Sequence, residues 1–366
     1  MVNAARILIL SLALLLGMPG PYSAIRSLSS YTGFYSAGSQ AQALSSEYVD
    51  NEEAGDDVYI RIDKDEVSGR KKEVSNLRFL TDERMSGSAQ FSESQFRRLA
   101  VMLHAQSDHI WIVDCRQESH GFINGMAVSW CDSNNEANLG KTAEEVEAEE
   151  AALAALTGTT VTISPAWGDH RRAGLNIPVQ KWETERSLAA SEGIQYLRLS
   201  CTDHVWPSSG EIDKFIAFAS ALPEDAWLHF HCRAGSGRTG AFMSIYEMMQ
   251  KPGTPVADIL QHQADTGSGS LVHRASSKKS HAQKERCVLI RAVYQYIQAN
   301  RDSGYEVKWS EWLASHSETI TLHVGDHLDG TGYSSDQLVV NDSLEALSAG
   351  QATVLVGDRI FNIRVE

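Results

Sequence analysis

The sequence has few cysteines, no excess of positive charge, and no apolar run long enough to span a membrane. The five cysteines are Cys115, Cys131, Cys201, Cys232 and Cys287, and no two have the spacing of metal ligands, so no cysteine-based metal site is expected. The net charge of −15 argues against a general nucleic-acid binder and against a helix that lies on anionic lipid. A polyanionic substrate remains compatible with this charge, because the local field at a pocket decides such binding.

Residues 1–24 have the pattern of a secretory signal. Arg6 precedes the apolar run Ile7–Leu16, which is too short to span a bilayer. Tyr22-Ser-Ala24 is an imperfect cleavage site because the residue three positions back is large, and an uncleaved anchor is the alternative. We expect a periplasmic or secreted protein without stable membrane association after cleavage. Residues 25–56 are rich in small and acidic residues, which predicts a loosely ordered leader.

Short apolar strands alternate with amphipathic helices, which predicts an α/β fold in 366 residues that are 42% hydrophobic. Strands are expected at 58–63, 110–114, 160–164, 196–200 and 227–230, and helices at 93–104, 142–156, 183–192, 211–222, 240–250, 255–263 and 285–300. Residues 318–366 change to alternating strands with Gly-Asp or Asp-Gly turns, which indicates a small β-rich appendage.

The chain is organised around the stretch Trp227–Met243. A buried strand ends at His231, a tight loop follows with Gly235 and Gly237, and an apolar helix begins after Arg238. A strand, a glycine-rich loop and a helix N-terminus together form an anion site from backbone N–H groups and the helix dipole.

Two side chains of this stretch predict chemistry as well as binding. Cys232 sits where loop amides and the helix dipole stabilise a thiolate. Arg238, six residues on, can bind two oxygens of a phosphate with its planar fork. Thr239 can donate its hydroxyl to the sulfur, and His231 is expected to hold the loop through hydrogen bonds to backbone carbonyls. The pattern favours attack on a phosphate monoester with a cysteinyl-phosphate intermediate, against the alternative of a structural cysteine at a strand end.

The reaction also needs an acid for the leaving alkoxide and a base for water, and Asp203 is the candidate for both. It follows a strand, next to His204. The alternative, an N-cap for the next helix, is better filled by Ser209. A second polar segment, Cys115–Gly121, ends another strand and is interpreted either as part of a site or as a capped loop with an internal salt bridge. Cys115 or Cys201 could bond reversibly to Cys232, although buried free thiols are the default.

Several motifs in one order make the chain similar to a known family. His231–Thr239 resembles the signature loop of protein-tyrosine-phosphatase-like enzymes. The segments Thr202–Pro207, Asp114–Gly125, Asn138–Lys141, Met85–Ser92 and Trp309–Leu313 narrow the resemblance to the cysteine-dependent bacterial phytases, over roughly residues 57–316.

The resemblance implies a tyrosine-phosphatase-like core, a central mixed sheet flanked by helices, with a small inserted partial β-barrel. It places this catalytic domain at 57–317, before the extension 318–366. It implies stepwise dephosphorylation of myo-inositol hexakisphosphate without a metal or cofactor. Cys232 would be the nucleophile, Arg238 the clamp, and Asp203 the general acid and base, supported by His231 and Thr239. The implied substrate contacts are His204, Arg233, Ala234, Gly235, Ser236, Gly237, Arg78, Lys279, Arg286 and Lys141, with Lys181 as a weaker candidate.

The chain departs from the family pattern at three places, and other functions compete. Arg233 stands where Glu is frequent, Gly240 where a second Thr is common, and an aromatic contact near His281 is missing. These departures bear on which inositol phosphate is preferred. The competing functions are a protein phosphotyrosine or phosphoinositide phosphatase, an inositol-phosphate-binding module without catalysis, and a partner-binding role carried by residues 318–366. For each basic candidate the alternative is a solubilising surface charge.

Overall fold

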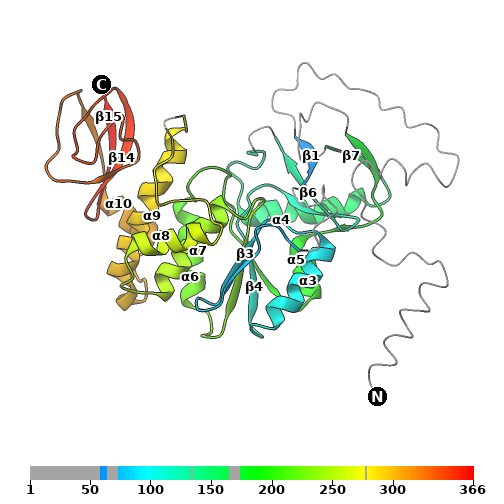
Figure 1. Ribbon diagram of the computed structural model, residues 1–366. Coiled ribbons are helices and arrows are strands. Elements are labelled where there is room, and N and C mark those ends of the chain that lie inside the picture. Colours follow the sequence, from blue (N-terminus) through cyan, green and yellow to red (C-terminus); the bar gives the residue numbers. More distant parts are fainter. Residues whose placement is uncertain (1–57, 64–72, 133–134, 165–173, 277) are drawn as a thin grey trace, which may run out of the picture.

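The computed structural model describes residues 58–63, 73–132, 135–164, 174–276 and 278–366, which form three sheets and the helices packed on them (Figure 1). The predicted signal and leader lie outside these residues and stay predictions. Within the described ranges, every helix is too short or too polar to cross a membrane. The predicted α/β class is confirmed, with mixed sheets and helices in the expected order.

The central sheet has five strands and positions the site. Its order is β10 (Gln195–Arg198), β4 (Ile110–Asp114), β11 (Trp227–His231), β3 (Met85–Ser88) and β2 (Arg78–Leu80), and only β2 runs antiparallel to its neighbour. The register pairs His231 with Asp114 on one side and with Ser88 on the other. The carboxyl ends of three parallel strands therefore meet at one edge, where sites form in α/β sheets.

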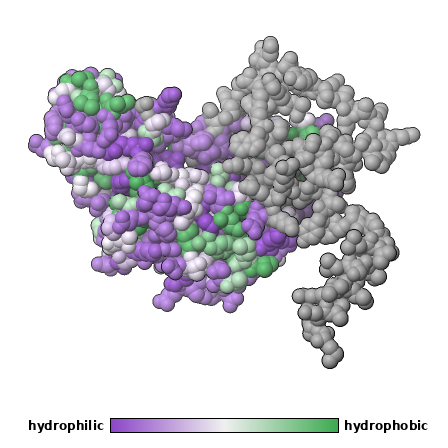
Figure 2. Space-filling view, in the orientation of Figure 1, coloured by the Kyte–Doolittle hydropathy of each residue, from purple (hydrophilic) through white to green (hydrophobic). Residues whose placement is uncertain are grey.

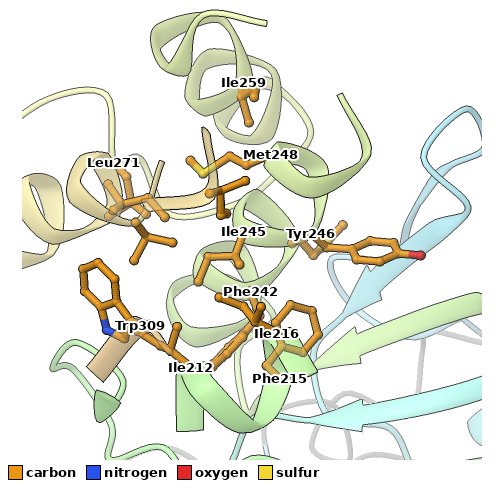
Figure 3. Packing of buried hydrophobic residues seen from close by; sticks show 14 of the residues in the cluster. Ile212, Phe215, Ile216, Phe242, Ile245, Tyr246, Met248, Ile259, Leu271 and Trp309 are labelled. Carbon is orange, nitrogen blue, oxygen red and sulfur yellow. The ribbon is translucent and has the colours of Figure 1, made fainter. Parts of the chain in front are cut away.

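Helices cover both faces of this sheet (Figure 1). One apolar cluster joins the sheet to α6 (Ser209–Ser220), α7 (Gly237–Gln250), α8 (Val256–Asp265), α9 (His281–Asn300) and α10 (Trp309–His316), and another joins it to α3 (Glu93–His104) and α5 (Glu185–Ser191). Figure 3 shows the first cluster, where Phe215 packs edge-on against Phe242, and the buried Trp309 lies on the side away from the sheet. Almost the whole of α7 is buried, which explains its apolar sequence.

Helices α6 and α9 begin earlier than predicted, and their caps give the reason. The side chain of Ser208, not of Ser209, accepts the capping hydrogen bond of α6, from Glu211 N–H. Helix α9 begins at His281 because Ser280 and Gln283 form a capping box, so the basic run around residue 284 is already helical.

The second sheet has six strands in the order β8 (Leu175–Pro178), β7 (Thr160–Ser164), β1 (Tyr59–Ile62), β6 (Met126–Cys131), β5 (His120–Ile123) and β9 (Trp182–Glu183), and α4 (Ala143–Ala152) with the turn Leu153–Leu156 lies beside it. The β5–β6 hairpin was not predicted, although Asn124-Gly125 is a strong hairpin signal. Closure of this sheet into a partial barrel stays a prediction.

The C-terminal sheet contains four strands, β12 (Ser317–Leu322), β15 (Arg359–Val365), β14 (Gly350–Val356) and β13 (Tyr333–Ser334), in that order. It has its own apolar cluster, which includes Ile363. Leu355 and Ile360, however, belong to the cluster of the central sheet and α6–α10. Figure 2 shows apolar residues gathered at the outer tip of this sheet, above a largely hydrophilic surface. The extension is thus β-rich as predicted, but it shares a core with the rest.

Two alanine substitutions in β15 test this shared core. Ile360→Ala removes a side chain from the central cluster, and Ile363→Ala removes one from the C-terminal cluster. Each should lower the free energy of unfolding by about 2–5 kcal/mol, because both sites are buried. The eight tryptophans all precede residue 317, so their fluorescence reports only on the preceding part. If the sheets unfold as one unit, denaturant curves followed by tryptophan fluorescence shift for both variants. A shift for Ile360→Ala alone would mean that the C-terminal sheet unfolds independently.

Candidate active site

The loop between β11 and α7 together with the first residue of α7, residues 232–237, is called the nucleophile loop below. It passes so close to β3 that a Cβ at position 235 would lie 2.3 Å from the carbonyl carbon of Ser88, and Gly235 has a φ of +66°. Only glycine fits there. Two backbone hydrogen bonds fix the loop from outside, from Gln90 N–H to Arg233 O at 3.3 Å and from Gly269 N–H to Ser236 O at 3.1 Å.

Cys232 lies at the base of this loop and is 3% exposed. Burial alone would raise the pKa of its thiol, but Arg238 and the hydroxyl and amide of Thr239 favour the thiolate more, so that the pKa falls below its usual value. Burial raises the pKa of the other four cysteines, Cys115, Cys131, Cys201 and Cys287. All five are free thiols. A reversible bond from Cys232 to Cys115 or Cys201 stays a prediction.

The lower pKa of Cys232 compared with the other four cysteines predicts selective, pH-dependent alkylation of Cys232. Its reaction with iodoacetamide should begin at lower pH than that of an ordinary thiol, because only the thiolate reacts. Thr239→Val removes a hydroxyl that favours the charged form, so the pKa rises and the midpoint of the alkylation profile moves to higher pH. Mass spectrometry of the modified peptide measures both profiles, with Cys232→Ser as the blank. An unchanged midpoint in Thr239→Val would contradict the role given to this hydroxyl.

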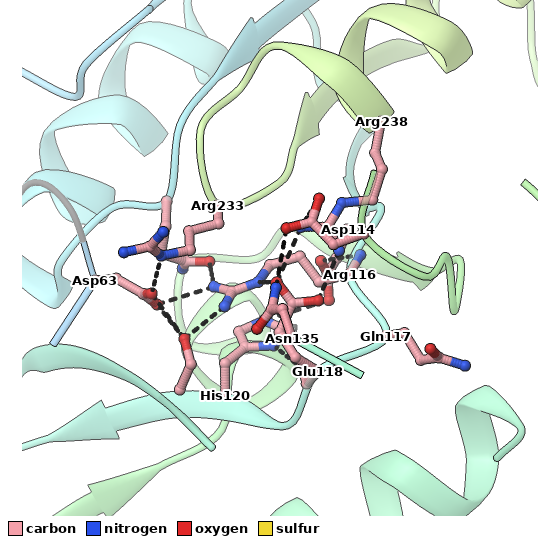
Figure 4. Close-up of polar contacts among 12 residues, drawn as sticks. Asp63, Asp114, Arg116, Gln117, Glu118, His120, Asn135, Arg233 and Arg238 are labelled. Carbon is pink, nitrogen blue, oxygen red and sulfur yellow. Dashed lines mark hydrogen bonds and ion pairs between the residues drawn. The ribbon is translucent and has the colours of Figure 1, made fainter. Parts of the chain in front are cut away.

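Arg238 is oriented by a carboxylate that sequence reasoning did not single out. Its two terminal nitrogens donate to the two oxygens of Glu118 at 2.6 and 3.0 Å, in a buried bidentate pair (Figure 4). One of them also donates to Cys201 O at 3.1 Å. Burial opposes charge on both partners, but each holds the other ionised: the pKa of Glu118 lies well below its usual range and that of Arg238 above it.

Glu118 is in turn held by Arg116, the centre of a buried network (Figure 4). Arg116 donates to Glu118 at 2.9 Å, to Asp63 at 3.0 Å and to Ser129 at 2.6 Å. Burial disfavours the Asp63 carboxylate, but Arg116 and Arg233 lower its pKa to about 2. The polar segment Cys115–Gly121 has two interpretations, as part of a site or as a loop with an internal salt bridge. Both apply, because the ion pair of Arg116 with Glu118 also orients Arg238.

Asp203 lies on the open side, with its side chain 22% exposed. It accepts a hydrogen bond from Asn135 at 3.0 Å, and Arg238 lies 3.3 Å away. Burial opposes its ionisation, yet Arg238 keeps the pKa of Asp203 below its usual value. An anion that engages Arg238 would weaken this effect and let Asp203 take up a proton more readily. His204 is next to it, 66% exposed and in the left-handed region at φ +66°.

His231 is held differently from the prediction. No backbone carbonyl receives its hydrogen bonds among the described residues; instead its Nε2 lies 2.6 Å from a carboxylate oxygen of Glu185. Glu185 also lies 3.3 Å from His120 and accepts a hydrogen bond from Gln90 at 2.8 Å. Despite burial, the two histidines hold the pKa of Glu185 well below its usual value. The correction has a simple cause: the first turn of α5 supplies a buried carboxylate whose position the sequence around His231 does not disclose.

The predicted basic contacts fall into two groups. Arg233 belongs to the nucleophile loop, with its Nε 3.3 Å from Asp63, and Arg286 lies beside the loop, where a Cβ on Gly237 would be 3.1 Å from one of its nitrogens. Arg78 is buried behind the loop, where it donates to Gly235 O at 2.9 Å and to Ser268 at 3.1 Å. Burial lowers its pKa to about 10. In this arrangement Arg78 supports the loop, and its contact with substrate stays a prediction.

The predicted lysines are more exposed. Lys279 lies at the surface before α9. Lys141 forms an ion pair with Glu149 at 2.7 Å, and Lys181 forms one with Glu183 at 2.6 Å, which fits the alternative of surface charge. Arg61, which the sequence did not single out, reaches the site through Asn135, whose side-chain oxygen accepts its hydrogen bond at 3.3 Å.

Two groups of side chains in the described part of the chain have atoms close enough to share a metal ion: Glu83, Glu247 and His262, and Asp114, Glu185 and His231. Basic side chains of the protein already contact the carboxylates of both. Lys251 contacts Glu83 and Glu247 in the first, and histidines and Arg198 surround the carboxylates of the second. We therefore assign no metal to either group.

Comparison with solved structures identifies the family. A PTP-like phytase from Bdellovibrio bacteriovorus is 34% identical, with a TM-score of 0.60 over 70% of this chain and 95% of that chain. The chain belongs to the PTP-like phytase family. The sequence model of this family, PTPlike_phytase, described as "Inositol hexakisphosphate", matches residues 113–250, from β4 to the end of α7. The resemblance drawn from the motifs is thus confirmed.

Two relatives are longer. The PTP-like myo-inositol phosphatase from Mitsuokella multacida, solved in complex with myo-inositol-(1,3,4,5)-tetrakisphosphate, is 31% identical with a TM-score of 0.64 over 71% of this chain and 50% of that chain. Effector protein hopD2 from Pseudomonas syringae pv. tomato is 24% identical over 221 residues, which are 56% of this chain and 46% of the effector. This PTP-like phytase family member spans about half the length of each.

Proposed function

We propose that this protein is a cysteine-dependent phosphatase that removes phosphate stepwise from myo-inositol hexakisphosphate. The observation that carries the proposal is the arrangement at the nucleophile loop, where a thiol of lowered pKa, a bidentately held arginine and a carboxylate converge. Family membership and the inositol tetrakisphosphate in the Mitsuokella relative support the substrate class.

In the first step the Cys232 thiolate attacks the phosphorus of one phosphate group. An S–P bond forms while the P–O bond to the inositol oxygen breaks, and Asp203 gives its proton to that oxygen. Loop amides and Arg238 stabilise the charge on the phosphoryl oxygens. Entry of the phosphate weakens the pairing of Arg238 with Asp203, which lets Asp203 take up the proton that it needs.

In the second step Asp203, now ionised, accepts a proton from water. The water oxygen attacks phosphorus, the S–P bond breaks, and inorganic phosphate leaves the regenerated thiolate. Thr239 donates to the sulfur and so makes it a better leaving group. No step needs a metal, because the arginine and the amides supply the positive charge.

The experiment that tests the proposal measures phosphate release by the purified protein, with reductant and a chelator, from inositol hexakisphosphate and from a phosphotyrosine peptide. Release from inositol hexakisphosphate that persists with the chelator supports the proposal. Activity on the peptide alone would assign the protein to the phosphotyrosine phosphatases. Tight binding of inositol hexakisphosphate without release from either substrate would favour a binding module.

A further inference from the structure

The segment between α8 and α9 connects the nucleophile loop with the C-terminal sheet. Near its start, Gly269 donates its amide to Ser236 O at 3.1 Å, and Ser268 accepts a hydrogen bond from Arg78 at 3.1 Å. Farther on, Val272 O accepts hydrogen bonds from Arg291 at 3.0 Å and from Tyr333 at 3.1 Å. One side of the segment therefore contacts the site, and the other contacts β13.

Arg286, in the second turn of α9, stands over the nucleophile loop. A Cβ on Gly237 would lie 3.1 Å from one of its terminal nitrogens. Among the described residues no hydrogen bond or ion pair engages this guanidinium, and its Nε is buried without a partner. Burial lowers its pKa, against the pull of Cys287, Asp203 and Cys232. A charged group that is held near the nucleophile without a partner is suited to receive an anion.

The neighbours of Arg286 in α9 are tied to the C-terminal sheet. Lys284, nearly buried, pairs with Asp336 at 2.5 Å. Glu285 accepts a hydrogen bond from Thr353 at 3.1 Å. These two contacts lie directly before position 286 and fix the first turns of the helix.

A second set of contacts joins the C-terminal sheet to α9 and to the segment before it. The ring of Tyr333 lies between the guanidinium groups of Arg274 and Arg291, each 3.9 Å from its centroid. Arg274 also pairs with Asp342. Such stacked arginines give an interface with a defined geometry.

We propose that the C-terminal sheet is a substrate-positioning unit of this site. Through Asp336 and Thr353 it holds the start of α9, so that Arg286 stands ready beside the loop for a second phosphate of a polyphosphorylated substrate. The inference rests on the proposed function. It replaces the view of residues 318–366 as a separate module, and it assigns Asp336 and Lys284 as positioning residues.

Deleting the sheet would not test this, because Leu355 and Ile360 belong to the shared core. The test is Asp336→Asn in the full chain, assayed with inositol hexakisphosphate and with p-nitrophenyl phosphate, which has one phosphate. The KM for inositol hexakisphosphate should rise about fivefold, as expected for a displaced charge contact, while kcat/KM for p-nitrophenyl phosphate stays within about twofold. Asp329→Asn, an exposed acid between β12 and β13, is the control for the change in net charge.

Coupling to Arg286 separates positioning from general destabilisation. Arg286→Ala should raise the same KM, and adding Asp336→Asn to it should have no further effect, because both act through one contact. The charge-reversed pair Lys284→Glu with Asp336→Lys should restore part of the affinity. The inference would be overturned if the effects of Arg286→Ala and Asp336→Asn on KM multiplied in the double variant. Equal losses of activity on inositol hexakisphosphate and p-nitrophenyl phosphate would overturn it as well. A wild type that is active on p-nitrophenyl phosphate but not on inositol hexakisphosphate would instead overturn the proposed function.

Discussion

Cys232→Ser is expected to lower phosphate release from inositol hexakisphosphate at least about 10⁴-fold, while the variant still binds the substrate. The serine hydroxyl is far less acidic than the thiol whose pKa Arg238 and Thr239 lower, so the charged nucleophile disappears. Arg238 and the loop amides stay in place, so the binding of phosphate groups is kept. Steady-state phosphate release measures the loss, and isothermal titration with inositol hexakisphosphate measures the binding.

Cys131→Ala is the matched control. Cys131 is buried in β6, its thiol has a raised pKa, and it lies outside the nucleophile loop. Its loss should leave kcat within about twofold of the wild type. Residual activity of Cys232→Ser above about one thousandth of the wild-type rate would contradict the assignment of Cys232 as nucleophile.

Glu118→Gln has the second largest expected effect. The amide keeps the shape of the carboxylate but removes the charge that fixes the guanidinium of Arg238 through two hydrogen bonds. Disrupting one partner of a buried charged pair costs about 2–3 kcal/mol where the pair serves the transition state, which corresponds to about a 30- to 150-fold fall in kcat. Phosphate release under saturating substrate gives this number, and thermal unfolding shows whether the variant is folded.

The control for this variant is Glu149→Gln, which makes the same chemical change in an exposed ion pair with Lys141. It should change kcat by less than about twofold, because exposed pairs contribute little. If Glu118→Gln is folded and as active as the wild type, Arg238 is oriented by the loop backbone and by Cys201 O instead.

The sequence around Cys232 and Arg238 predicts the loop well because everything that shapes it is local: a strand, glycines at fixed offsets and a helix start. The partners of these residues are not local. Glu118 lies 120 positions from Arg238, and Asp63 lies 170 positions from Arg233. The register of β11 against β4 brings Glu118 close to Arg238, whereas Asp63 follows β1 of the second sheet and reaches Arg233 from there. A single sequence states which strands form, but it does not state which carboxylate faces which arginine.

The predicted basic contacts also depend on partners that are distant in the sequence. Arg78, Lys141 and Arg286 look alike in the sequence as cations near the phosphatase motifs. The structure separates them by their partners: Arg78 donates to Gly235 O, Lys141 pairs with Glu149, and Arg286 has no partner among the described residues. Partner choice depends on side chains from distant elements, which local patterns do not encode.

The contact between Asp203 and Arg238 means that the site carries its own tethered counter-ion. A small anion that enters must compete with a carboxylate that is always present, and its apparent affinity falls accordingly. A substrate with several phosphates meets the same competitor, but its other phosphates gain contacts that the carboxylate cannot block. For the substrate proposed above, the resting pair would therefore act as a filter against free inorganic anions, because only a substrate with further phosphates has additional contacts to offset the competition.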